Sequence, residues 1–229
     1  QQAFLDAVTH EMKTPLASLR LSVDTLSLHD PPAPRREEFL ARMQSDLDRL
    51  EATVHQVLAA ARADAREQPR ERARVDLVAL LARSIDEIRE RHGLPSDAVR
   101  FDRSSAVRVR GDEAELGLVF GNLLENAVKY SDPPVDVRVA LRAAGDGRVT
   151  IEITDRGIGI PRRELRKIFQ RFYRAGRDMQ RKVAGLGLGL FIVRSLVRRQ
   201  GGRVVALSEG SGQGSRFVVT LRAAGRAGP

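Results

Sequence analysis

The feature that most constrains the fold is an apolar repeat with helical spacing in the first 66 residues. Between residues 40 and 61, apolar side chains follow alternating steps of three and four, the a/d pattern of a heptad seam: Leu40, Met43, Leu47, Leu50, Val54, Val57 and Ala61. A stripe with steps of four or three precedes it: Phe4, Val8, Met12, Leu16, Leu19, Val23 and Leu26. The prolines of residues 29–34 cannot continue a helix, so we predict a helical hairpin. Such a hairpin cannot bury both stripes alone, and we expect two copies to form a four-helix bundle.

The periodicity changes after a charged linker at residues 67–74, and residues 75–224 predict a mixed domain. Helical patterns cover residues 77–91, 112–130 and 188–199. Strand patterns cover residues 107–109, 135–141, 149–153, 204–207 and 216–221. Helices on one face of a largely antiparallel sheet form an α/β sandwich, so the fold class of the whole chain is α+β. Residues 225–229 are left as a tail.

Composition limits the chemistry that the chain can carry. No cysteine is present, which excludes a disulfide scaffold, a thiolate metal site and a cysteine nucleophile. The net charge of +9, from 39 basic and 30 acidic residues, favours an anionic partner. The basic residues are mostly arginines spread along the chain, and no Trp and two Tyr leave little to stack on bases. We therefore expect no nucleic-acid binding.

Two glycine-rich segments indicate a phosphate ligand. Asp155-Arg-Gly-Ile-Gly-Ile-Pro161 follows a predicted strand, and Gly185-Leu-Gly-Leu-Gly-Leu190 opens a predicted helix. Alternate glycines let the backbone approach a ligand closely, and the N–H groups at a helix N-terminus bind anions. A dinucleotide fingerprint and a Walker P-loop are excluded, because no βαβ unit surrounds these glycines and no Gly-Lys-Ser/Thr follows them.

The predicted helix between these segments carries a polar face. Asn122, Asn126, Lys129 and Tyr130 lie at i, i+4, i+7 and i+8. Two amide oxygens one turn apart can coordinate Mg²⁺ beside substrate phosphates, and a lysine one turn on can neutralise phosphate charge. From the residues alone, a solvated helix face with an asparagine pair explains this pattern equally well.

Together, five segments resemble the sequence boxes of sensor histidine kinases. Residues 122–131, 155–161, 168–174 and 185–190 are similar to the nucleotide-binding boxes of that family, and His10-Glu-Met-Lys-Thr-Pro-Leu16 is similar to its phosphoacceptor box. The resemblance implies a dimerisation and phosphotransfer domain over residues 1–66. It implies an ATP-binding domain over residues 75–224, with the fold of the gyrase-type and heat-shock chaperone ATPases.

The resemblance implies roles for the residues of an ATP and Mg²⁺ site. Asp155 would accept a hydrogen bond from the adenine amino group, with Gly157, Gly159, Ile160 and Tyr130 near the base. Asn126, helped by Asn122, would hold Mg²⁺, and Lys129 would contact phosphate. Gly185, Gly187 and Gly189, with Leu186 and Leu188 between them, would form the lid hinge and cradle phosphate. Phe169 and Phe172 would anchor the base of a lid at about residues 175–184, and Arg174 would reach toward the γ-phosphate. Leu186 stands where the family usually has Ser or Thr, so we expect weaker nucleotide affinity.

His10 differs from the other histidines, which we interpret as structural or solvated. It lies roughly 200° around the helix from the apolar stripe, at ~100° per residue, and we expect it to face solvent. The resemblance gives His10 the role of phosphoacceptor and gives Glu11 that of orienting or deprotonating the imidazole. Helix geometry resists this second role, because side chains at i and i+1 do not face each other. Thr14 would position a water molecule for dephosphorylation.

The predicted function is ATP-dependent autophosphorylation of His10 and transfer of the phosphoryl group to an aspartate of a response regulator, with phosphatase activity on that regulator. We expect the regulator to dock near exposed Ser18, Leu21 and Ser22. Because residue 1 is Gln, we expect the chain to be a fragment. The resemblance implies that it is the cytoplasmic portion of a bacterial membrane protein, attached through a missing N-terminal sensor portion. Two alternatives stay open: an ATPase that uses ATP as a conformational clamp, and a dimeric scaffold or phosphatase-only core.

Overall fold

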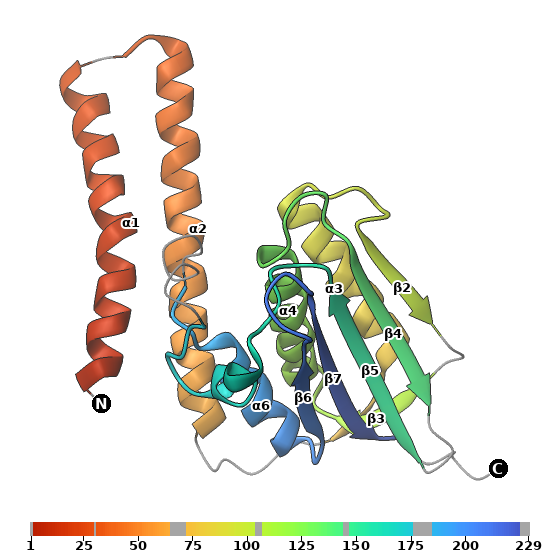
Figure 1. Cartoon of the computed structure of the whole chain (residues 1–229). Coiled ribbons are helices and arrows are strands. Elements are labelled where there is room, and N and C mark those ends of the chain that lie inside the picture. The colour runs from red at the N-terminus through yellow and green to blue at the C-terminus, as the bar shows by residue number, and fades with distance from the viewer. Residues whose placement is uncertain are drawn as a thin grey trace.

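The computed structural model describes residues 2–29, 31–64, 72–103, 107–143, 147–175 and 185–224, without the side chains of residues 2–7, 10 and 62–64. A long helical hairpin lies beside an α/β domain (Figure 1), as the sequence predicts. Four predictions fall wholly or largely outside the described part of the chain: residues 67–71 of the linker, the lid beyond residue 175, the tail at 225–229, and the direction of the His10 side chain.

The hairpin consists of helix α1 (Gln2–His29) and helix α2 (Ala33–Asp64), so the turn is shorter than residues 29–34. Pro15 lies inside α1, and the helix continues through it. Pro34 lies in the first turn of α2, where a backbone N–H has no partner within the helix in any case.

The apolar residues of the hairpin divide between two faces. On α1, the face that packs against α2 is buried or half-buried, and its residues follow steps of four and three: Val8, Met12, Pro15, Leu19, Ser22 and Leu26. Leu16 and Val23, from the predicted stripe, are 60% and 45% exposed. The expectation that Ser22 is exposed is wrong, because it lies on the packed face and is 2% exposed.

A mixed five-stranded sheet forms the domain, in the order β2-β4-β5-β7-β6. Its strands are β2 (Val99–Arg103), β4 (Val137–Ala143), β5 (Arg148–Asp155), β6 (Arg203–Leu207) and β7 (Ser215–Arg222). Its neighbouring strands are antiparallel except for β2 and β4, which are parallel. Two short strands, β1 (Ala73–Asp76) and β3 (Arg108–Gly111), pair separately, so the last two residues of the predicted linker belong to a strand.

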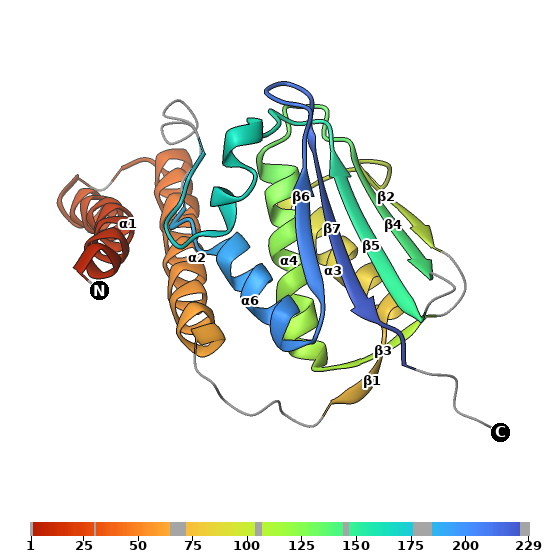
Figure 2. The same ribbon diagram turned by 60° about the horizontal axis from the view of Figure 1, so that its bottom comes forward.

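Three helices cover one face of the sheet (Figures 1 and 2): α3 (Leu77–His92), α4 (Glu113–Lys129) and α6 (Gly189–Arg199). Aspartates cap two of them, because Asp76 accepts from the N–H groups of Val78 and Ala79, and Asp112 accepts from that of Glu115. Two 3₁₀ turns, η1 (Arg162–Glu164) and η2 (Lys167–Phe169), follow β5.

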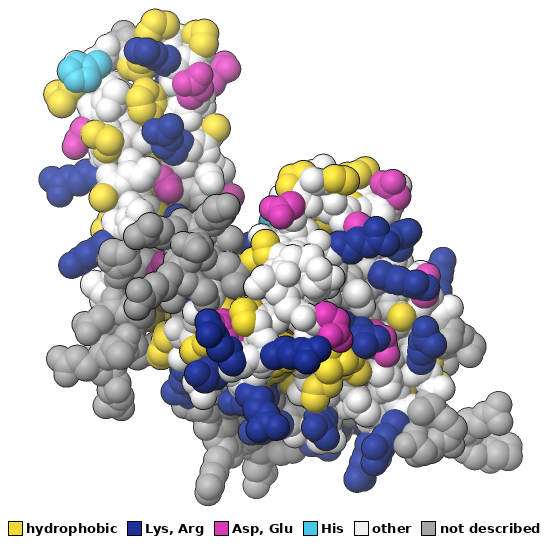
Figure 3. All heavy atoms as spheres, in the orientation of Figure 1, with side chains coloured by type: hydrophobic (Ala, Val, Ile, Leu, Met, Phe, Trp, Pro, Cys, Tyr) yellow, Lys and Arg dark blue, Asp and Glu magenta, His cyan; other side chains and the backbone are white. Residues whose placement is uncertain are grey.

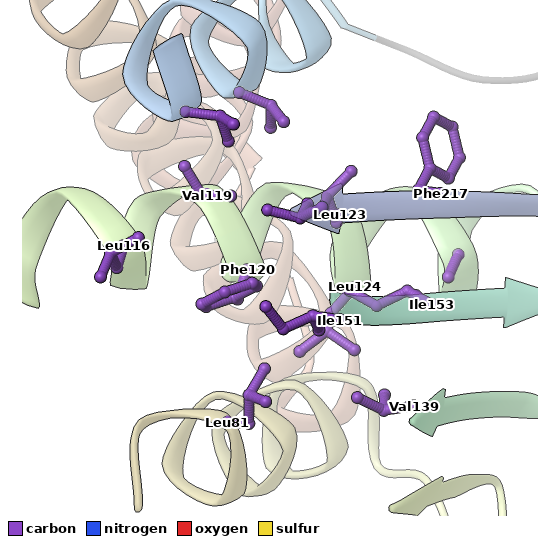
Figure 4. Close-up of a cluster of buried hydrophobic side chains, with 14 of the residues drawn as sticks. Leu81, Leu116, Val119, Phe120, Leu123, Leu124, Val139, Ile151, Ile153 and Phe217 are labelled. Carbon is purple, nitrogen blue, oxygen red and sulfur yellow. The ribbon is translucent and has the colours of Figure 1, made fainter. Parts of the chain in front are cut away.

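Helix α4 is the centre of the domain core. Phe120, Leu123 and Leu124 are fully buried, and Phe120 and Leu124 point toward the sheet residues Ile151 and Ile153 (Figure 4). The opposite face of the sheet carries exposed arginines on every strand (Figure 3): Arg100, Arg138, Arg142, Arg148, Arg203, Arg216 and Arg222. Much of the positive charge of the domain therefore lies on a solvated sheet face.

Helix α2 lies between α1 and the domain, next to α6 (Figure 2). Ala60 is 5% exposed, and Val57 and Ala59 pack against the domain core. One helix of the hairpin is thus in contact with the α/β domain of its own chain. Within the described ranges, no helix is long and apolar enough to cross a membrane.

Candidate functional site

Two adjoining cavities form a cleft between α4, the end of β5, and the segment that leads into α6. About 630 Å³ of empty space lies in the Asp155 cavity and about 610 Å³ in the Asn122 cavity, and both volumes include space that is open to solvent. Residues that line both are Asn126, Tyr130, Ile168, Tyr173, Arg174 and Leu190. Because the two cavities share these residues, a single ligand can contact both of them, as in the clefts that typically bind small molecules.

The carboxylate of Asp155 is fixed at the C-terminal end of β5. Its side chain is 5% exposed and lines the Asp155 cavity. The Oδ1 atom accepts hydrogen bonds from the N–H groups of Gly157 at 2.9 Å and Ser215 at 3.0 Å. The Oδ2 atom accepts one from the Ser215 hydroxyl at 2.5 Å. A carboxylate held by three donors presents its remaining acceptor positions in a defined direction.

Close backbone packing explains the glycines that follow Asp155. A Cβ atom at Gly157 would lie 2.1 Å from the carbonyl oxygen of Tyr130, and one at Gly159 would lie 2.0 Å from that of Gly210. Gly214 shows the same constraint, with 2.1 Å to the carbonyl oxygen of Asp155. Three loops are therefore pressed together beneath the cleft, and these contacts exclude any side chain.

Helix α4 supplies the polar wall of the Asn122 cavity with Asn122, Asn126 and Lys129. The Nδ2 group of Asn122 donates to the Leu118 carbonyl at 2.8 Å. Its Oδ1 atom lies 2.8 Å from where a Cβ of Gly189 would be. The predicted polar face of this helix is confirmed as a cavity wall.

The alternate glycines Gly185, Gly187 and Gly189, the last of which is the first residue of α6, each face a different group. A Cβ at Gly185 would lie 3.3 Å from Lys129 Nζ, and one at Gly187 would lie 2.9 Å from the backbone of Phe172. Phe172 donates its N–H to the Gly187 carbonyl at 3.0 Å and has a φ of 60°. These glycines join the α6 start to α4 on one side and to the segment after η2 on the other.

Burial and charge act on two ionisable groups of the cleft. Burial lowers the pKa of the Lys129 ammonium from its ordinary value, and the nearby guanidinium groups of Arg174 and Arg49 lower it further. The carboxylates of Glu125 and Glu11 act in the opposite direction on this pKa. Burial also raises the pKa of the Tyr130 phenol.

Most of the predicted nucleotide-site residues line the two cavities. Four do not: Gly157, Phe169, Phe172 and Leu188. Leu188 is 1% exposed and lies in the core, and Phe169 makes an edge-to-face contact with Phe217 at 6.5 Å between ring centroids. Leu188 and Phe169 therefore belong to the core next to the cleft and do not line the cavities themselves. Leu186 lines the Asn122 cavity, with a side chain that is 5% exposed.

Sequence reasoning missed Ser215, Tyr173 and Gln56, which all line the cleft. Ser215 follows the glycine-rich residues 210–214 at the start of a strand, which was a usable signal. Gln56 belongs to α2, far away in the chain, and no pattern in its own helix marks it.

The phosphoacceptor-like segment lies in the middle of α1. The backbone of His10 is helical, and Thr14, one turn later, is exposed. Glu11 accepts a hydrogen bond from Arg49 of α2, with Nη2 to Oε2 at 3.1 Å. The structure thus places a histidine segment on the hairpin and the two-cavity cleft on the domain that α2 contacts.

Comparison with known families matches both parts of the chain. Residues 1–66 match the His Kinase A (phospho-acceptor) domain, and residues 111–225 match the histidine kinase-, DNA gyrase B-, and HSP90-like ATPase family. The chain belongs to the sensor histidine kinases.

Relatives extend the likeness over nearly the whole kinase chain. It is 30% identical over 224 residues to the sensor-like histidine kinase SenX3 of Mycolicibacterium smegmatis, covering 95% of this chain and 56% of the relative. It is 34% identical over 222 residues to the signal transduction histidine-protein kinase/phosphatase MprB of Mycolicibacterium paratuberculosis, covering 93% and 41%. The chain thus spans about half the length of these relatives.

A solved structure shows the same arrangement. Full-length ShkA in complex with AMPPNP superposes with a TM-score of 0.68 at 29% identity, covering 98% of this chain and 46% of that one. The fold of the α/β domain as a member of this ATPase family is therefore supported by both sequence and structure.

The donor set of the cleft fits Mg²⁺ that arrives with phosphate. Among the described residues, no group of three or more His, Cys, Asp or Glu side chains could hold a metal ion. Asn122 and Asn126 both line the Asn122 cavity and offer neutral amide oxygens. Mg²⁺ is commonly held by one or two protein oxygens together with substrate phosphates and water, which these residues match.

Replacing Gly157 with alanine should disrupt the cleft. The added Cβ would lie 2.1 Å from the Tyr130 carbonyl, so the end of α4 or of β5 must shift. We expect ATP affinity, measured by calorimetric titration, to fall more than about tenfold. Gly121→Ala is the matched control: it adds the same methyl group on α4, where a Cβ would have no atom within 4 Å, and it should leave the affinity for ATP unchanged. Equal affinities for both variants would contradict the packing argument.

Lys129 should make ATP binding sensitive to alkaline pH. Its pKa is lowered by burial, so it loses its charge at a lower pH than an ordinary lysine does. Affinity should therefore weaken as pH rises from neutral through that lowered pKa. A titration series with Lys129→Arg, which stays protonated, should show a flatter profile. Parallel profiles for the two proteins would show that Lys129 does not contact phosphate.

Proposed function

We propose that this chain binds ATP with Mg²⁺, phosphorylates His10, and passes the phosphoryl group to an aspartate of a response regulator. The observation that carries this proposal is the pairing of the two-ended cleft with a phosphoacceptor segment on the hairpin that contacts the same domain. Phosphatase activity on the regulator belongs to the proposal, with Thr14 positioning a water molecule.

The cleft residues divide between the two ends of ATP. Asp155 would accept from the adenine amino group, a contact that the carbonyl of guanine could not make. Tyr130, Gly159 and Ile160 line the same cavity and would flank the base. Lys129 and Arg174 line the Asn122 cavity and would contact phosphate. Asn126 and Asn122 would hold Mg²⁺, which neutralises phosphate charge when bound.

Phosphoryl transfer would use the lone pair of one imidazole nitrogen of His10. A neutral imidazole attacks the γ-phosphorus in line, so that a P–N bond forms as the P–O bond to ADP breaks. The proton on the other ring nitrogen leaves to a carboxylate, for which Glu11 is the candidate. Most of the rate enhancement in such transfers comes from positioning and electrostatics.

Exposed apolar residues support a homodimer through the hairpin. In the described part of the chain, eight of the ten large exposed apolar residues lie on α1 and α2: Leu16, Leu21, Val23, Leu28, Leu40, Leu47, Val54 and Leu58. Leu40, Leu47 and Val54 repeat every seven residues on α2. A second copy of the hairpin would cover this column and complete a four-helix bundle.

We propose the functional division that the sequence indicates, with the first two residues of β1 moved from the linker to the domain: residues 1–66 for dimerisation and phosphotransfer, 67–72 as linker, 73–224 for ATP binding. The regulator would dock on the hairpin near His10, at the exposed Leu21 and half-exposed Ser18. In the full protein, an N-terminal sensor portion in the bacterial membrane would leave this core in the cytoplasm.

Labelling tests the kinase proposal directly. Incubation with Mg²⁺ and ATP labelled in the γ-phosphate should give label on the parent chain that is stable in alkali and labile in acid. His10→Gln and Asn126→Ala should abolish it, because one removes the acceptor and the other a metal ligand. His55→Gln changes an exposed histidine of α2 and should keep the label. Release of free phosphate without labelled protein would favour an ATPase clamp, and binding without label a scaffold or phosphatase-only core.

Sedimentation tests the dimer. Leu47→Glu should convert a dimer into a monomer, because each copy loses the burial of the exposed half of Leu47, roughly 0.7–1.5 kcal/mol, and gains a charge in the seam. Leu118 of α4 is 47% exposed, against 49% for Leu47, so Leu118→Glu is the matched control and should stay dimeric. An unchanged mass for Leu47→Glu would exclude this column as the interface.

A further inference from the structure

Helix α2 holds the carboxylate next to the phosphoacceptor. Arg49 reaches across the hairpin and donates from Nη2 to Glu11 Oε2 at 3.1 Å. The Glu11 side chain is 18% exposed and that of Arg49 is 39% exposed, so water screens this ion pair less than one on an open surface. The two residues are 38 positions apart, and only the folding of the hairpin brings them together.

This ion pair lies near the phosphate end of the cleft. The charges of Glu11 and Arg49 both act on the pKa of Lys129, in opposite directions, so they lie within electrostatic range of its ammonium group. Gln56, two turns after Arg49 on α2, lines the Asn122 cavity. The same stretch of α2 therefore runs between the acceptor segment of α1 and the phosphate wall of the domain.

The geometry of α1 alone does not orient the carboxylate of Glu11 toward His10. Side chains at i and i+1 diverge by ~100° around a helix, so nothing within α1 directs the carboxylate of Glu11 toward the imidazole of His10. A guanidinium from another helix can fix the carboxylate through one oxygen and leave the second oxygen free to accept. It also offsets the repulsion between Glu11 and an incoming phosphate.

We propose that Arg49 is a positioning residue for phosphoryl transfer, which holds the Glu11 carboxylate where it can accept the imidazole proton of His10. This role rests on the proposed kinase function. Arg49 acts through Glu11, so it affects the transfer step and leaves ATP binding unchanged. It also makes helix α2 a contributor to the reaction, in addition to its part in dimerisation.

A kinetic comparison on the full 229-residue chain tests this role. Arg49→Ala should slow phosphohistidine formation at saturating ATP by about 10- to 100-fold, part of what a positioned proton acceptor contributes. The KM for ATP should stay within about twofold, because Arg49 does not line either cavity. Arg49→Lys keeps the charge but loses the planar fork, and should recover part of the rate. Arg42→Ala, an exposed arginine two turns earlier on α2, is the matched control and should match the parent.

A double-mutant cycle separates positioning from stability. If Arg49 acts through Glu11, Arg49→Ala should add little to the loss that Glu11→Gln already causes, and the double variant should be as slow as Glu11→Gln alone. Multiplied losses would overturn the proposal, as would a normal rate for Arg49→Ala or a rate loss accompanied by a raised KM. If Arg49→Ala loses the dimer, the same cycle with Arg49→Lys decides the question. An unlabelled parent chain would instead overturn the kinase function, and this role with it.

Discussion

Helix α4 has apolar side chains on one face and the amide and ammonium groups of the cleft on the other, so burial of the first face fixes the second. Leu116, Phe120 and Leu123 are fully buried against the sheet and its neighbours. Each such side chain contributes roughly 1.5–3 kcal/mol by leaving water. Asn122, Asn126 and Lys129 share the same rigid backbone, so their geometry follows from core packing. A helix held this tightly keeps the two amide side chains on one wall of the Asn122 cavity.

The opposite wall of the cleft depends on close packing of backbone. The loops after β5, after β6 and at the end of α4 approach one another at Gly157, Gly159 and Gly214, where a single methyl group would collide. Their carbonyl and N–H groups bond directly, as Ile158 does to Tyr130 at 3.0 Å and Gly214 to Gly157 at 3.0 Å. This arrangement holds Asp155 in place with little help from side-chain packing, and it explains why one carboxylate can be buried and still point into a cavity.

The hairpin serves three purposes with different sets of residues. One face of α1 packs on α2, another column of leucines and valines stays exposed for a second copy, and a third set on α2 meets the α/β domain through Val57 and Ala60. The polar residues Arg49 and Gln56 of α2 belong to none of these three apolar sets. Arg49 contacts Glu11 in the acceptor segment and Gln56 lines the cleft, so α2 connects the two. The packing of the α/β domain against its own α2 therefore brings Glu11 and Arg49 of the hairpin within electrostatic range of Lys129 in the cleft.

The sequence alone determined the hairpin, the order of the helices, the polar face of α4 and the strand-end aspartate, because each depends on residues within one or two turns or one strand. The sequence did not predict strands β1 and β2, since both are short and carry arginines at exposed positions. Tertiary structure alone decided that Ser22 is buried, that Leu188 and Phe169 belong to the core, and that Ser215 holds Asp155. The same holds for Arg49, which meets Glu11 across 38 residues. Periodicity specifies which face of an element is apolar, but only packing decides which distant element covers that face.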